Sequence, residues 1–179
     1  MNFLPAQAST VTATTLPVAC GIANLYPSTD LADAYAIELP PGNQASPEQL
    51  ARYIFTQQAP WARGLMKLRD VLVAGFGLKT TGDLVATDAA NQKQRVGIFK
   101  IYSRSAQDIV LGEDDKHLDF RLSLYIHPAT PAGGRRLVLS TVVQCHNRLG
   151  RAYIFVIAPF HRLIVQTSLR RAARRGWPG

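Results

Sequence analysis

Two stretches in the second half of the chain alternate apolar and polar residues with the period of a β-strand. In residues 116–127 the apolar face carries Leu118, Phe120, Leu122, Leu124 and Ile126, and in residues 136–146 it carries Leu137, Leu139, Thr141, Val143 and Cys145. Residues 128–135 between them have the Pro and Gly content of a hairpin loop. Antiparallel pairing across this loop places Ile126 near Leu137, Phe120 near Val143, and His117 near His146. A slip of one residue in this pairing would put apolar and polar side chains on the same face, so the pattern excludes it. A slip of two residues keeps the faces and stays open.

The first half of the chain predicts shorter strands and two helices. Alternation over residues 33–39 predicts a strand that ends at a Pro-Pro-Gly-Asn turn. Ser46 is a favourable N-cap and Pro47 a favourable first helical residue, so a helix is predicted to begin there. A second helix is predicted over residues 61–75, and further strands over residues 95–102 and 108–111.

The end of the chain predicts a long helix over residues 151–175. Its side chains are apolar nearly all round as far as Val165, which is typical of a buried helix. Pro159 lies inside this stretch and is expected to kink or restart the helix. The basic residues after Leu169 favour a helix C-terminus.

Together these elements predict an α+β domain in which a curved antiparallel sheet packs on the long C-terminal helix. A sheet with one apolar face needs that face covered, and the terminal helix is the only predicted element long and apolar enough to cover it. This is the layout of a helix-grip fold, which often keeps an apolar cavity between the sheet and the helix. Residues 1–25 are uncharged and rich in Ala, Thr and Ser, so we expect a flexible N-terminal arm followed by a single helix-grip domain over residues 26–179.

The composition fits one globular domain. The chain has 179 residues, 47% of them apolar and 18% charged, which is enough to build a core without disulfides or metal. Cys20 and Cys145 match no zinc or redox spacing, so we expect reduced structural thiols. No run reaches the roughly 18 to 20 apolar residues of a membrane span, and the N-terminus lacks the pattern of a secretory signal. A cytoplasmic protein without a transmembrane segment is therefore expected.

The net charge of +8 is unevenly placed along the chain. Residues 1–119 hold 10 Lys and Arg against 12 Asp and Glu, whereas residues 120–179 hold 10 Arg and no acidic residue. This asymmetry indicates either an anionic partner or packing of the acidic part against the basic part within one domain.

Several stretches resemble an uncharacterised bacterial family of domains of unknown function, found alone or behind a short-chain-dehydrogenase-like NAD(P)-binding domain. The matching stretches are residues 33–40 (DAYAIELP), 68–72 (LRDVL) with 77–79 (GLK), 112–121 (GEDDKHLDFR), and 146–153 (HNRLGRAY) with 159–161 (PFH). The resemblance implies a helix-grip fold of the START and Bet v 1 kind and carries no established catalytic residue. This chain lacks the Rossmann half and any Gly-x-Gly-x-x-Gly motif, so it cannot bind a dinucleotide in that way by itself.

One set of candidate site residues lies on the predicted hairpin. His117 and His146 are expected side by side, with Asp119 and Arg121 further along the same face. Two imidazoles and a carboxylate have the composition of a facial metal triad or a general acid–base pair. The same face also carries Ser123, Ser140 and Gln144, as an outer surface does, so solvent exposure is the simpler explanation.

A second set belongs to the terminal helix. Helical spacing groups His161 with Ile154, Ile157 and Val165, on a part of the helix that should be buried. A buried imidazole needs a hydrogen-bond partner, and a core partner is the simpler alternative to a ligand. Arg148, Arg151 and Tyr153 are candidates for the mouth of a pocket.

Other chemistry has little support in the sequence. The acidic turn at residues 112–115 lacks the spacing of an EF-hand loop, and no nucleophile elbow is present, so we assign no catalytic residue, metal or cofactor. The terminal arginines at positions 170, 171, 174 and 175 have no interleaved aromatic residues, so nucleic acid is not an expected partner.

The leading hypothesis is non-catalytic binding of a small apolar or amphipathic molecule in a cavity between the sheet and the C-terminal helix. Two alternatives stay open: an enzyme or accessory subunit that acts on such a molecule with an oxidoreductase partner, and an interaction module that uses the Arg-rich C-terminus on an anionic partner. The candidate ligand-binding residues are His161, Tyr153, Arg148, Arg151, His146, His117, Asp119 and Arg121. The identity of the ligand, any catalysis and the oligomeric state are left open by the sequence.

Overall fold

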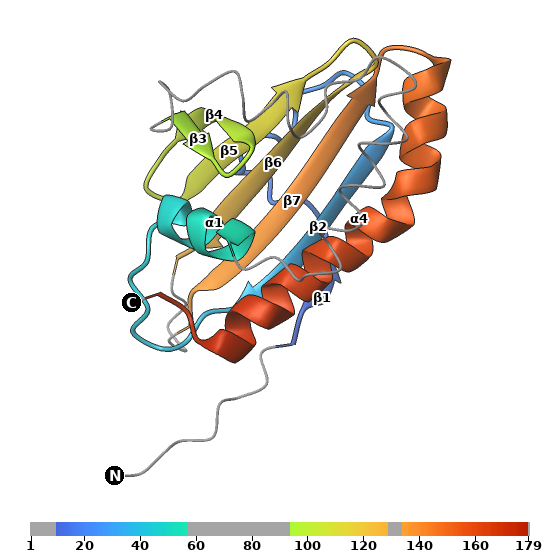
Figure 1. Cartoon of the computed structure of the whole chain (residues 1–179). Coiled ribbons are helices and arrows are strands. Elements are labelled where there is room, and N and C mark those ends of the chain that lie inside the picture. Colours follow the sequence, from blue (N-terminus) through green and yellow to red (C-terminus); the bar gives the residue numbers. More distant parts are fainter. Residues whose placement is uncertain (1–9, 57–93, 129–133, 179) are drawn as a thin grey trace.

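The computed structural model describes residues 10–56, 94–128 and 134–178, which form an α+β fold with an open, seven-stranded antiparallel sheet (Figure 1). The strands are β1 (Thr12–Thr14), β2 (Leu31–Glu38), β3 (Arg95–Val96), β4 (Phe99–Arg104), β5 (Asp108–Asp114), β6 (Leu118–His127) and β7 (Arg136–Cys145), and the helices are α1 (Pro47–Thr56) and α4 (Arg148–Arg175). Their order across the sheet is β1-β2-β7-β6-β5-β4-β3. The two strands with the clearest alternation, β6 and β7, therefore lie in the interior of the sheet.

The register predicted for β6 and β7 is confirmed. Ile126 pairs with Leu137 and Phe120 with Val143, so a slip of two residues is excluded. Beyond the last strand pair, the backbone N–H of His146 donates to the carbonyl of His117 at 2.8 Å. Alternation excluded a slip of one residue because side chains on the wrong face would lose their apolar contacts, and the strand pairing in the structure excludes the slip of two.

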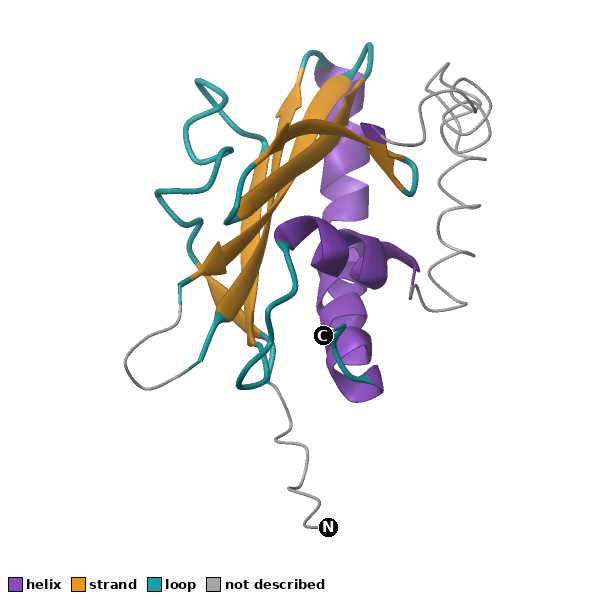
Figure 2. Cartoon of the chain, turned by 90° about the vertical axis from the view of Figure 1, so that its left-hand side faces the viewer, coloured by secondary structure: helices purple, strands orange, loops and turns teal. Residues whose placement is uncertain are grey.

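One face of the sheet carries both helices and the main core (Figure 2). The buried core unites Leu122, Leu124 and Ile126 of β6, Leu137 and Leu139 of β7, Leu50 and Ile54 of α1, and Val165, Leu169 and Ala172 of α4. In Figure 2 the end of the sheet formed by β3 and β4 bends toward the side of the helices. The predicted closure of an apolar sheet face by the terminal helix is confirmed.

Helix α4 begins a few residues earlier than predicted. Asn147 is its N-cap, with a side-chain oxygen that accepts from the N–H of Gly150 at 3.0 Å. Pro159 lies inside one continuous helix, so it does not restart the helix, although α4 changes direction along its length (Figure 1).

Helix α1 has the start that the sequence predicts. The Ser46 hydroxyl accepts from the N–H of Gln49 at 3.2 Å, while the Gln49 side chain accepts from the N–H of Ser46 at 2.8 Å. This reciprocal pair satisfies two N–H groups that the first helical turn leaves unbonded. The helix predicted over residues 61–75 and most of the loop over residues 128–135 lie outside the described residues.

The single strand predicted over residues 95–102 is wrong, because these residues form a hairpin. Val96 ends β3 and pairs with Phe99 at the start of β4, which leaves a two-residue turn at Gly97 and Ile98. Gly97 has a φ of 59°, a left-handed conformation that glycine adopts without strain and that tight hairpin turns require. Because apolar and polar residues alternate on both sides of the turn, the sequence pattern predicts one continuous strand here.

The second face of the sheet is covered by the N-terminal segment. Residues 10–25 of the expected flexible arm include β1, which pairs with β2 along the edge of the sheet. Cys20 and Ile22 are buried against Val110, Tyr125 and Val142. The expectation that the second face is solvent-exposed is therefore wrong for its centre, where Ser123 and Ser140 are fully buried. Uncharged small residues suit this role because they cover a sheet without burying charge. The domain boundary at residue 26 stays a prediction.

Candidate functional site

Helix α4 is held at both ends by hydrogen bonds. At its start, Arg151 donates to the carboxylate of Asp30 at 3.1 Å. Beyond its end, the Tyr53 hydroxyl donates to the carbonyl of Gly176 at 2.6 Å, and the side-chain amide of Asn43 donates to the carbonyl of Pro178 at 2.6 Å. These contacts fix the ends of the helix to the sheet and to α1.

The middle of α4 packs less tightly than its ends. Ile154 is buried near the start, and Val165, Ser168, Leu169 and Ala172 are buried toward the end. None of residues 155–164 is buried, although the structure describes all of them. The side chains of this middle stretch that are half-buried are Ile157, Ala158, His161 and Ile164. The helix is thus anchored at its ends and leaves a partly accessible apolar stretch between them.

A group of polar side chains lies between the middle of α4 and the sheet. Asp33 of β2 and Thr141 of β7 are direct partners across the two strands. The Nε2 atom of His161 lies 3.1 Å from the Thr141 hydroxyl and 3.4 Å from Oδ1 of Asp33. The Nε atom of Arg162 lies 3.6 Å from Oδ2 of Asp33. We call Asp33, Thr141, His161 and Arg162 the helix–sheet polar group.

Asp33 stands out within this group. Its side chain is only 10% exposed, and both carboxylate oxygens are buried without a hydrogen-bond donor among the described residues. The Arg162 guanidinium is close enough to Asp33 for attraction between charges, but both His161 and Arg162 lie too far from it for good hydrogen bonds. A buried carboxylate that lacks donors is unfavourable, and a molecule that brings a hydroxyl or ammonium group would satisfy it.

Partly buried aromatic and aliphatic side chains extend the same face of the sheet. Phe99, Ile101 and Phe120 pack against the main core without being fully buried. Phe99 makes edge-on contacts, with ring centroids 5.1 Å from Phe55 and 5.8 Å from Phe120. The helix-bearing face therefore combines apolar surface with one polar group.

The structure brings together two of the candidates on the hairpin, His146 and Asp119. Nε2 of His146 lies 3.2 Å from Oδ1 of Asp119. The ring of His117 instead contacts the side chain of Asn147, with 2.8 Å between Nδ1 and Nδ2. Because Asn147 also caps α4, His117 supports the start of the helix. No group of three metal-ligating side chains is found among the described residues.

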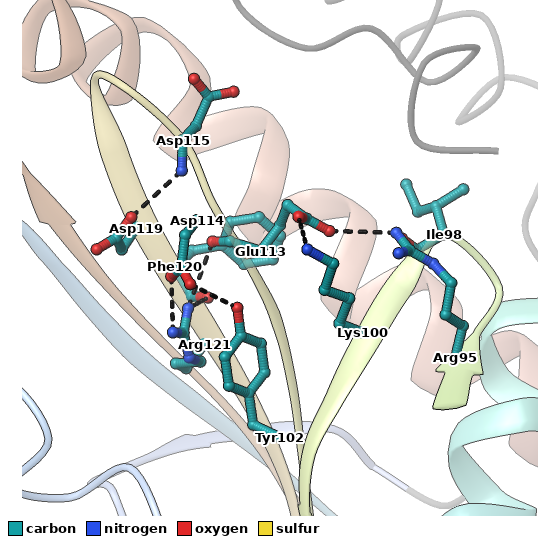
Figure 3. Close-up of polar contacts among 10 residues, drawn as sticks. All are labelled: Arg95, Ile98, Lys100, Tyr102, Glu113, Asp114, Asp115, Asp119, Phe120 and Arg121. Carbon is teal, nitrogen blue, oxygen red and sulfur yellow. Dashed lines mark hydrogen bonds and ion pairs between the residues drawn. The ribbon is translucent and has the colours of Figure 1, made fainter. Parts of the chain in front are cut away.

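Arg121 belongs to a separate cluster in which the charged atoms are well bonded (Figure 3). Its guanidinium lies 2.7 Å from the carboxylate of Asp114, donates to the carbonyl of Phe120 at 2.8 Å, and lies 3.6 Å from the ring centre of Tyr102. The Tyr102 hydroxyl donates to Asp114 at 2.8 Å. We call Arg121, Asp114 and Tyr102 the arginine cluster.

The pKa values in the arginine cluster follow from these contacts. Burial acts to raise the pKa of Asp114, but hydrogen bonds from Tyr102 and Arg121 outweigh it, so the pKa lies below its usual value. Burial and the bond to Asp114 raise the pKa of Tyr102. Asp114 therefore stays charged and Tyr102 stays neutral at neutral pH, as suits a structural contact.

The remaining candidates lie on the first turns of α4. Arg148 is exposed, and Arg151 is paired with Asp30. Tyr153 is half-buried and packs against a cluster that contains Leu31, Val143 and Ile154. These side chains lie near the start of the helix, toward the ends of β6 and β7.

Both cysteines are free and buried in the structure. Burial raises the pKa of the Cys145 thiol to about 11, and the nearby Asp30 carboxylate acts in the same direction. Burial also raises the pKa of Cys20. Both side chains are therefore protonated thiols at neutral pH, which makes them poor nucleophiles.

Sequence reasoning found His161 but missed Asp33, Thr141 and Arg162 as its neighbours. The sequence did contain a sign of this polar group. Asp33 lies on the same face of its strand as Tyr35 and Ile37, and Thr141 lies on the apolar face of β7. A polar residue at an apolar position of a strand is expected to have a partner across the core. The pairing of β2 with β7 was needed to bring the two together.

A family model described as a protein of unknown function, DUF2867, matches residues 25–168. The chain belongs to this family. The match covers the sheet from β2 onward, the helix–sheet polar group and most of α4. No curated protein matches the chain. No solved structure matches it either.

Helix α4 also has the length and apolar composition of a membrane span, with 22% of its most apolar window buried. Such a helix is weak support for a membrane span, because core helices of soluble proteins share these properties. The expected absence of a transmembrane segment stays a prediction.

Proposed function

We propose that this protein binds a small amphipathic molecule between the helix-bearing face of the sheet and the middle of α4. The polar end of the molecule donates a hydrogen bond to Asp33 beside His161, and its apolar part lies toward Phe99, Ile101 and Phe120. The observation that carries this proposal is the buried carboxylate of Asp33, which lacks a hydrogen-bond donor among the described residues.

The packing of α4 supports the same function. A ligand that enters under a helix needs a place where the helix can move slightly away without unfolding. Helix α4 is bonded at both ends and half-buried in its middle, next to His161. In this proposal the arrangement of the sheet and helix is a helix grip of the START and Bet v 1 kind, and the protein acts in the cytoplasm.

Native mass spectrometry of the purified full chain tests the proposal. We expect a bound small molecule that is released on denaturation and can then be identified from an organic extract. The Asp33→Leu variant is expected to lose at least about tenfold in the bound fraction, because it removes the acceptor to which the polar end of the ligand donates.

The His146→Leu variant is a matched control, because His146 pairs with Asp119 away from the helix–sheet polar group. It is expected to retain the bound molecule. Loss of the molecule in this control but not in Asp33→Leu would move the site to the end of the hairpin. The absence of any bound molecule in the wild-type chain, together with no binding of a long-chain alcohol added as a probe, would refute the proposal.

A further inference from the structure

We propose that the side of α4 turned away from the sheet docks on the surface of an anionic lipid bilayer. This outer face consists of Ala152, Phe155, Val156, Pro159, Phe160 and Leu163, all of which are exposed. The proposal concerns a different side of the helix from the one that faces Asp33, and it does not depend on the proposed ligand.

The outer face is continuous because of its helical spacing. Positions 152, 155, 156, 159, 160 and 163 follow the three- and four-residue steps that place side chains on one side of a helix. Phe155 is 84% exposed, Val156 is 53% exposed, and Leu163 is 50% exposed. The buried residues Ile154 and Val165 lie on the other side of α4, so exposure here is a property of one side of the helix.

Exposed apolar side chains scattered singly are normal, but a contiguous patch indicates an interaction surface. Two phenylalanines and two branched aliphatic residues within three turns make such a patch. In Figure 1 α4 runs along one side of the molecule, and the sheet lies on its other side. The outer face is therefore turned away from the strands.

The charges around the patch match an anionic surface. Arg148 precedes it on the first turn of α4, and Arg170 and Arg174 follow it, all exposed. No acidic residue occurs anywhere in residues 120–179. An apolar stripe bordered by arginines is the pattern of helices that lie in the plane of a bilayer, where the apolar side chains insert and the arginines contact lipid phosphates.

Docking in the membrane plane fits this helix better than crossing the membrane. One side of α4 packs on the sheet through Ile154, Val165 and Leu169, and its start is bonded to Asp30. Crossing the bilayer would require these contacts to break, whereas docking by the outer face leaves them intact. The apolar composition of α4 then reflects two apolar sides, one for the sheet and one for lipid.

Vesicle flotation with the full chain tests this proposal. We expect the protein to float with vesicles of phosphatidylcholine and phosphatidylserine, and to bind far less to vesicles of phosphatidylcholine alone. Because the arginines contribute through charge, binding should weaken strongly as salt is raised. The double variant F155S/F160S is expected to lose at least about tenfold in partitioning, since two aromatic side chains no longer insert.

Matched controls use residues of the same kind elsewhere on the surface. Val18 is 90% exposed and Leu25 is 44% exposed, and both belong to the segment that covers the other face of the sheet. The V18S/L25S variant should float as the wild type does. Replacing Arg148, Arg170 and Arg174 by glutamine should cost roughly fivefold per arginine, and replacing the exposed Lys100 and Lys116 by glutamine should cost much less.

Several outcomes would overturn the proposal. One is a wild-type chain that does not float with phosphatidylserine vesicles, and another is equal loss in F155S/F160S and V18S/L25S. A third outcome would assign the outer face to a second copy of this chain instead. In that case the wild type does not bind vesicles and elutes as a dimer in size-exclusion chromatography, and the F155S/F160S variant elutes as a monomer. Thermal melting monitored by circular dichroism verifies that each variant is folded.

Discussion

The arginine cluster and the helix–sheet polar group each hold a buried charged side chain against the sheet, Arg121 in the first and Asp33 in the second, but they differ in how well that charge is bonded. In the arginine cluster, Asp114 is bonded by Arg121 and by the Tyr102 hydroxyl. In the helix–sheet polar group, the buried oxygens of Asp33 have the charge of Arg162 nearby but no hydrogen-bond donor among the described residues.

This difference separates a structural role from a functional one. A buried charge with all its bonds made stabilises one arrangement of the strands, and removing any member leaves the others unsatisfied. A buried charge that lacks donors contributes little to folding and is available to a ligand. We therefore expect substitutions in the arginine cluster to affect stability, and those in the helix–sheet polar group to affect binding.

The largest effect is expected for Gly112→Ala, which removes the space that Arg121 occupies. A Cβ atom at this position would lie 2.3 Å from the carbonyl oxygen of Phe120 and 2.8 Å from Cδ of Arg121. Because a backbone atom has to shift, we expect a loss of about 3 kcal/mol in the free energy of unfolding, measured by urea denaturation. Gly134→Ala is the control, since among the described residues its Cβ would meet the Glu38 side chain alone, at 3.4 Å. Equal losses in both variants would mean that Gly112 has no special role.

The next effect is expected for Arg121→Gln, which leaves Asp114 without its charged partner. The expected loss is about 2 kcal/mol in the free energy of unfolding, since the charge-assisted bonds of the buried Arg121 guanidinium are lost. Arg136→Gln is the comparison, because Arg136 is 41% exposed and lies 3.6 Å from an exposed Glu38. That variant should change stability by less than about 0.5 kcal/mol. A stable Arg121→Gln protein would contradict the structural role of the cluster.

A third test uses Asp30, which is fully bonded at the start of α4. The N–H of Cys145 and then Arg151 lower the pKa of the Asp30 carboxyl. Asp30→Asn should therefore cost about 1 to 2 kcal/mol at pH 7. A carboxyl with a lowered pKa stabilises the fold above its unfolded pKa, and this contribution is lost as the pH falls through the folded pKa. The difference in the free energy of unfolding between wild type and Asp30→Asn, measured by urea denaturation, should therefore shrink below about pH 4. A difference that stays constant with pH would mean that the charge of Asp30 does not cause it.

The smallest effect on stability is expected for Asp33→Asn. This substitution removes a buried charge that lacks hydrogen-bond donors, so the free energy of unfolding should change by less than about 1 kcal/mol in either direction. A loss as large as that of Arg121→Gln would place Asp33 among the structural residues. The comparison between the two clusters would then fail.

Much of the fold could be predicted from local patterns. The period of two along β6 and β7 specified their faces and excluded a slip of one residue in their pairing, and Ser46 with Pro47 specified the start of α1. The long apolar stretch before the terminal arginines predicted the helix that covers the sheet. These features depend on neighbours in the chain or across one loop, which alternation and capping report directly.

Other features depended on the tertiary structure. The turn at Gly97 interrupts a run that otherwise reads as one strand, and the burial of the second face depends on Cys20 and Ile22, which follow no strand or helix pattern. Asp33 meets His161 only because β2 pairs with β7 and α4 crosses both strands. The sequence by itself determined which residues of β6, β7 and α1 face the core under the helices, because burial imposes a local period on each element. Only the tertiary structure decided which polar residues meet there, because contacts between distant elements leave no period in the chain.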